Sequence, residues 1–96
     1  MVLGTNLSAG TGQQLTFAGI PITSTQSITI TMSGGTGDAD LYVRKGSYPT
    51  TSTYTCSPYL DGNDEYCTII GYTGTVYVMI DAASAFSGVR LEYTKA

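Results

Sequence analysis

The chain has 96 residues, 11% of them charged, and a formal net charge of −3 at pH 7. This length fits a single domain, 1–96, and a sandwich of this size buries somewhat over ~60% of its unfolded surface. The four Lys and Arg residues leave no basic stripe that would neutralise a nucleic-acid backbone. No apolar run approaches the ~20 residues that cross a bilayer. We therefore expect neither nucleic acid nor a membrane as a partner.

The expected elements, in chain order, are short strands separated by turns. Apolar residues do not recur at helical spacing over any long window, whereas several short runs alternate with a period of two. The predicted strands are 14–18, 26–33, 39–44, 65–70, 75–81 and 88–94, with a weaker one at 2–7. Turn signals stand at 10–12, 34–38, 61–64, 71–74 and 84–88. This pattern predicts an all-β fold, namely an antiparallel, jelly-roll-like β-sandwich of about six to eight short strands.

The alternation also assigns side chains to faces. In the run 27–32, Ile28, Ile30 and Met32 point one way and the hydroxyl side chains between them point the other. The same pattern elsewhere predicts a core of Ile28, Ile30, Met32, Leu41, Val43, Val76, Val78, Ile80, Val89, Leu91 and Tyr93. Tyr42 and Tyr77 alternate with core residues, so both rings are expected on the opposite face.

The two cysteines, Cys56 and Cys67, enclose ten residues rich in turn formers. A disulfide between them would contribute roughly 2.5–3 kcal/mol through the entropy of the unfolded chain. The alternative is a metal site, but zinc requires four ligands and the chain has no His. A disulfide indicates an oxidising compartment, hence a secreted protein. Residues 1–6 lack the features of a signal peptide, so we expect the export signal in a longer precursor.

The candidate catalytic groups are few. Without His, a Ser or Cys nucleophile would need Lys or a carboxylate as its base, and no such motif is present. Asp38 and Asp40 would leave one face of a strand roughly 6.5–7 Å apart, a separation that suits an inverting glycosidase. A domain this small hardly supplies the enclosing cleft that such a pair needs. We therefore expect no enzymatic activity.

Asp38 and Asp40 have two other interpretations. Beside flexible glycines they offer hard oxygen ligands to calcium, although calcium takes six to eight oxygens. Alternatively, they accept hydrogen bonds from loop N–H groups and fix the turn. No other cofactor is expected, and the acidic run 61–65 is predicted to be a solvated turn.

Tyrosine is the abundant aromatic residue, with eight copies. We predict Tyr42, Tyr48, Tyr72 and Tyr77 as binding residues, because flat exposed rings on a rigid sheet stack on sugars or dock on a protein fibre. The alternative is that these rings cover the sheet or face a parent enzyme.

Three stretches match a known family. They are 33–43 (SGGTGDADLYV), then 49–67 with its two cysteines and with Pro49, Asn63 and Glu65, and finally 74–78 (GTVYV) together with 86–89 (FSGV). In these stretches the chain resembles the bacterial pre-peptidase C-terminal domain, a β-sandwich module that trails many secreted peptidases. It departs from the family pattern at Ser57, where Arg is common, and at Val76, where Trp is common.

The resemblance implies a disulfide between the paired cysteines, and it implies several roles. Family members have been viewed as aids to secretion, as segments removed on maturation and as anchors to insoluble substrates. Related collagen-binding modules use surface tyrosines and calcium. We expect a monomeric, noncatalytic module that tethers a secreted peptidase, its partner in cis, to an insoluble protein or polysaccharide such as collagen or chitin. The alternative is a secretion, folding or maturation segment that contacts its own parent peptidase and is removed.

Overall fold

The computed structural model describes residues 1–23, 27–58 and 63–95. Within these ranges the regular structure consists of strands: β1 (Val2–Ala9), β2 (Gln14–Thr16), β3 (Ile20–Ile22), β4 (Ile28–Ser33), β5 (Thr36–Lys45), β6 (Glu65–Ile69) and β7 (Gly74–Lys95). The predicted turn at 61–64 and the start of the strand predicted from residue 26 lie partly outside the described residues. In the part of the chain described, no helix has the length and apolarity needed to cross a bilayer.

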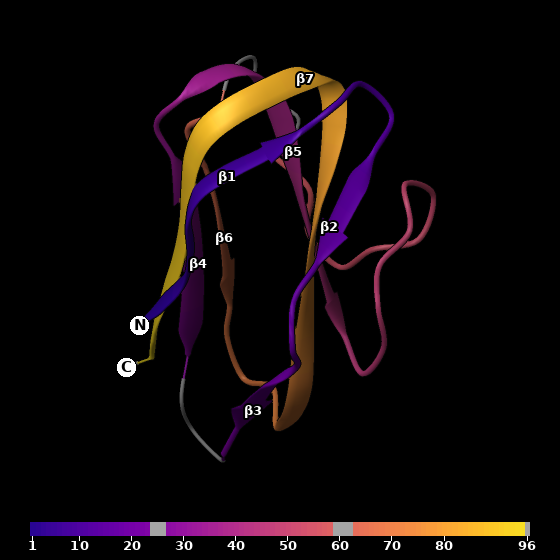
Figure 1. The fold of residues 1–96 in the computed structure, drawn as a ribbon. Coiled ribbons are helices and arrows are strands. Elements are labelled where there is room, and N and C mark those ends of the chain that lie inside the picture. Colours follow the sequence, from indigo (N-terminus) through magenta and orange to yellow (C-terminus); the bar gives the residue numbers. More distant parts are fainter. Residues whose placement is uncertain (24–26, 59–62, 96) are drawn as a thin grey trace.

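The strands form two antiparallel layers that share β7. In the first sheet the order is β1-β7-β4-β6. In the second sheet the first half of β7 lies between β5 on one side and β2 and β3 on the other. Figure 1 shows β7 arching across the top of the molecule from one layer to the other. The predicted antiparallel β-sandwich is confirmed.

The continuity of β7 corrects the sequence prediction of two strands separated by a turn at 84–88. Pairing with β5 extends as far as Thr36 opposite Ser87, so the chain bends there without reversing. Glycine in this region allows the backbones of β5 and β7 to approach each other closely. A Cβ on Gly37, whose φ is 90°, would overlap the Ala85 carbonyl oxygen and lie 2.7 Å from the Phe86 Cα.

Strand β3 was missed by the sequence prediction, and strand β2 is shorter than expected. Pro21 stands in the middle of β3, and proline within an apolar run argues against a strand. It is tolerated here because β3 is a short edge strand whose pairing is with β7, where Pro21 lies opposite Thr75. The weakly predicted first strand is complete, although three register shifts interrupt its pairing with β7.

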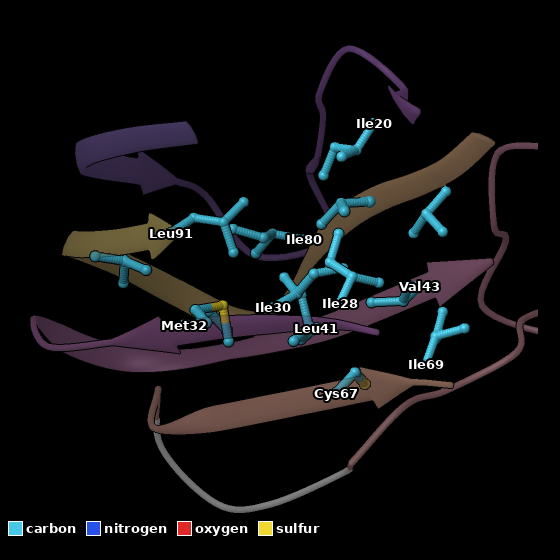
Figure 2. Close-up of a cluster of buried hydrophobic side chains, with 14 of the residues drawn as sticks. Ile20, Ile28, Ile30, Met32, Leu41, Val43, Cys67, Ile69, Ile80 and Leu91 are labelled. Carbon is cyan, nitrogen blue, oxygen red and sulfur yellow. The ribbon is translucent and has the colours of Figure 1, made fainter. Parts of the chain in front are cut away.

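The hydrophobic core lies between the two layers (Figure 2). All the predicted core residues except Tyr93 have an exposed fraction of 0%, and Tyr93 packs against them half-buried. The core also contains residues that the pattern did not select: Ile20, Ile22, Ala39, Cys67, Ile69, Ala82 and Phe86. Most of these belong to the short strands and to the bend of β7.

Side chains just before and at the start of β6 close the free edge of β5. The Ala39 N–H donates to Asn63 Oδ1 over 2.8 Å, and the Leu41 N–H donates to Glu65 Oε1 over 2.8 Å. The Asn63 amide also donates to two backbone carbonyls near the β4–β5 turn. The expectation of a solvated turn is therefore wrong for Asn63 and Glu65, which are both buried. An edge whose donors are satisfied in this way is protected from pairing with other chains.

The predicted disulfide joins Cys56 and Cys67, with their Cα atoms 6.2 Å apart. Cys56 also pairs with β5, because its carbonyl accepts the Val43 N–H over 2.9 Å. The bond therefore fastens the irregular segment after β5 to β6. Because Cys67 belongs to the core, the link runs from the edge of one layer into the packed interior.

Candidate functional site

The outer face of the second sheet carries Tyr42 and Tyr77, and part of it is covered. Tyr42 lies on this face as predicted, next to Met79 across the strand pair. Its exposed fraction is only 3%, because the Tyr54 ring packs edge-on against it at a centroid distance of 5.3 Å. The expectation that Tyr42 offers an exposed ring is wrong, since alternation predicts the side of a sheet but not what covers that side.

Tyr48 and Tyr77 form the exposed part of this aromatic layer. Their ring centroids are 4.6 Å apart, and Tyr48 is 43% exposed whereas Tyr77 is half-buried beside it. The Tyr48 hydroxyl donates to the Phe17 carbonyl over 2.7 Å. On the other side, a Cβ on Gly19 would lie 2.9 Å from the Tyr77 ring, so the glycine lets that ring approach the backbone. Both rings are therefore held in place before any partner arrives.

Arg44 adjoins this pair, and Lys45 contacts a third tyrosine where β5 ends. Because side chains alternate along a strand, Arg44 and Lys45 leave opposite sides of β5. Arg44 stands opposite Tyr77 across the strands, and its Nη1 donates to the Tyr48 carbonyl over 3.3 Å. The Lys45 ammonium lies 5.3 Å from the centroid of the Tyr72 ring. We call Arg44, Lys45, Tyr48, Tyr72 and Tyr77 the tyrosine patch. Cation–π contacts of this kind contribute about 0.5–1 kcal/mol at exposed sites.

A backbone carbonyl connects the two halves of the tyrosine patch. The Thr75 carbonyl accepts both the Gly46 N–H over 2.8 Å and the Tyr72 hydroxyl over 3.3 Å. The end of β5 and Tyr72 therefore meet at the start of β7. Of the four tyrosines predicted as binding residues, Tyr48 and Tyr77 are in contact, and Tyr72 lies at the adjoining strand end. The sequence prediction did not select the two cations. The available signal was alternation, which places Arg44 on the face of Tyr42.

The carboxylates gather elsewhere. Asp38, Asp40 and Glu65 each present an oxygen within 4.8 Å of the others. Asp38 and Asp40 come from one face of β5, as expected, while Glu65 reaches them from β6 and was not predicted. Asp38 Oδ1 is buried and, among the described residues, has no hydrogen-bond partner. Nearby, the Gly34 N–H donates to Asp64 Oδ1 and the Ala39 N–H donates to Asn63 Oδ1.

The cluster offers the type of ligand that calcium prefers, namely carboxylate oxygens. Calcium takes six to eight oxygens, so backbone carbonyls or water would complete the shell. Calcium binding at Asp38 and Asp40 stays a prediction, and the structure adds Glu65 as a third candidate ligand. A glycosidase mechanism needs a cleft that encloses a sugar. A hollow of about 380 Å³ is lined by Met1, Tyr93, Thr94 and Lys95, none of which is acidic.

Comparison with a family model identifies a match over most of this chain. The model for the bacterial pre-peptidase C-terminal domain matches residues 19–82. The solution structure of vEP C-ter 100 superposes with a TM-score of 0.76 at 39% identity, covering 93% of this chain and 88% of that one. The two folds therefore agree over nearly their whole lengths.

Curated relatives are longer proteins. The chain is 48% identical to a zinc metalloprotease of Helicobacter pylori over 91% of its own length and 34% of that protein. It is 48% identical to the hemagglutinin/proteinase of Vibrio cholerae and 53% identical to an extracellular protease of Xanthomonas campestris, spanning 14% and 15% of those proteins. The chain therefore spans about a third or less of the relatives it matches. They bear out the expectation of a secreted chain.

Proposed function

Because the chain belongs to the bacterial pre-peptidase C-terminal domain family, we propose that it is a noncatalytic module tethering a secreted bacterial peptidase to an insoluble protein or polysaccharide, such as collagen or chitin. Tethering raises the local concentration of an enzyme at its substrate without new chemistry. The name of the Vibrio cholerae relative, hemagglutinin/proteinase, joins hemagglutination to proteolysis, which supports this role.

The observation that carries the proposal is the fixed, exposed ring of Tyr48. Its hydroxyl is bonded to the Phe17 carbonyl and its ring packs on Tyr77, so little rotamer freedom is left to lose on binding. An aromatic ring ordered in advance gives contact area at a low entropic cost. The chemistry that catalysis requires has less support, since both cysteines form the disulfide and the chain contains no His.

The test is retention of the purified chain on insoluble collagen, chitin and cellulose. Tyr48→Ala should weaken retention on the polymer that binds by about tenfold, which corresponds to about 1.4 kcal/mol. Tyr66→Ala is the matched control, because Tyr66 is 66% exposed on β6 of the first sheet, outside the tyrosine patch. Tyr42→Ala is unsuitable because Tyr42 is buried. Absence of wild-type retention on every polymer would contradict tethering.

A second candidate function is a secretion, folding or maturation segment that contacts its own parent peptidase. The outer face of the first sheet supports it. A row of side chains, Val2, Glu92, Thr31 and Tyr66, crosses all four strands in register there, and both ends of the row are exposed. Under this alternative, deleting the module from the precursor lowers the secreted yield and leaves affinity for insoluble substrates unchanged.

A further inference from the structure

Positive charge is concentrated at one end of β5. Arg44 and Lys45 are two of the four Lys and Arg residues of the chain. Among the described residues neither forms an ion pair with a carboxylate, and the salt bridge present joins Arg90 to Glu92 on the first sheet. Both cations are therefore available to an anionic partner.

The negative charge on β5 lies at its other end. Asp40, the carboxylate on β5 nearest to Arg44, precedes it by four residues on an extended strand, which separates them by about 13 Å. Asp81 lies opposite Asp40 on β7. The Debye length at physiological ionic strength is about 8 Å, so the carboxylate cluster is largely screened from the tyrosine patch. The patch is thus locally positive on a chain whose formal net charge is −3.

The donors of the patch suit carboxylate or sulfate groups. A guanidinium carries five N–H donors, and the described residues give Arg44 one side-chain hydrogen bond, to the Tyr48 carbonyl. Its other N–H groups can bind a carboxylate or sulfate in bidentate fashion. The exposed Lys45 follows directly and leaves the opposite side of β5, so its charge lies around the strand end from Arg44. Tyr48 supplies an aromatic face of the kind that packs against a sugar ring.

We propose that the tyrosine patch binds an acidic polysaccharide. Arg44 contacts an anionic group beside Tyr48, which stacks on a sugar ring, and Lys45 contacts a further anionic group where the polymer passes the end of β5. This inference rests on the proposed tethering function and names the class of polymer. A neutral glycan would use the ring and leave the cations without partners. An acidic peptide would use the cations and leave the ring without a sugar to stack on.

The experiment compares two resins made from the same polysaccharide chain. Polygalacturonate carries a carboxylate on each sugar, and its methyl ester keeps the rings but removes the charge. In low-salt buffer with EDTA, which prevents calcium crosslinks, the chain should be retained on polygalacturonate at least about tenfold more strongly than on the ester. Added NaCl should abolish this difference, because exposed charge contacts are screened by salt.

Matched variants test the assigned residues. The double variant Arg44→Gln, Lys45→Gln should lose the preference for polygalacturonate, while Arg90→Gln with Lys95→Gln removes the same charge elsewhere and should keep it. Circular dichroism verifies that each variant is folded.

Each outcome supports or overturns the inference. Equal retention on both resins, or a preference that survives the Arg44 and Lys45 substitutions, overturns it. Equally strong retention on immobilised poly-glutamate overturns the assignment to a sugar polymer. Retention on collagen or chitin alone overturns this inference but leaves tethering intact, whereas no retention on any polymer overturns both.

Discussion

Gly37→Ala tests how closely β5 approaches the bend of β7. Gly37 has a φ of 90°, which costs a residue with a Cβ about 1–2 kcal/mol. In addition, the new Cβ would overlap the Ala85 carbonyl oxygen and lie 2.7 Å from the Phe86 Cα. Because backbone atoms cannot rotate away as a side chain can, overpacking adds about 1–3 kcal/mol. We expect a total loss of about 3 kcal/mol in the free energy of unfolding.

Gly71→Ala is the control for the contribution of φ. Gly71 has a φ of 72°, and a Cβ added to it would meet no described atom within 4 Å, so its substitution should cost about 1 kcal/mol. Urea unfolding of both variants with the disulfide intact gives the free energies by linear extrapolation. A difference between the two variants below about 1 kcal/mol would refute the close-approach argument, since only the clash distinguishes them.

Three further predictions concern the disulfide, the edge of β5 and the carboxylates. Replacing Cys56 and Cys67 together by Ala should lower the free energy of unfolding by about 2.5–3 kcal/mol, measured by urea titration, and an unchanged midpoint would count against a stabilising role. Asn63→Ala leaves a buried N–H of β5 without its acceptor, so it should lower the free energy of unfolding by about 1–3 kcal/mol in the same assay. A loss near zero would contradict this prediction. Millimolar CaCl2 should raise the Tm of the wild type but not of Asp38→Asn, Asp40→Asn, and equal shifts in both proteins would exclude the carboxylates as ligands.

The sequence predicts the sandwich and most of its core because the alternation of apolar and polar residues is a property of neighbouring positions. In β4, a period of two alone places Ile28, Ile30 and Met32 in the interior, and the structure buries all three completely. The disulfide is also local, since Cys56 and Cys67 are separated by 11 positions in the sequence. Each of these features depends on neighbours only a few positions away.

The features that the sequence did not predict depend on distant segments. Tyr42 is covered because Tyr54 folds back over the sheet, and Glu65 is buried because it bonds a strand that precedes it by more than twenty residues. The tyrosine patch likewise forms where the end of β5 meets the start of β7. Alternation specifies a face, whereas tertiary pairing decides which residues share it and which of them reach solvent.

The sharing of β7 by both layers bears on how the chain reaches its folded state during export. Strands β1, β2, β3, β4 and β5 all pair with it, and among the described strands the pairing that forms without it joins β4 to β6. A nascent chain that has emerged only as far as Tyr72 can therefore pair β4 with β6, and a lone pair of strands is too small for independent stability in water. Such a chain therefore has neither layer complete, and both layers can form only after β7 is available.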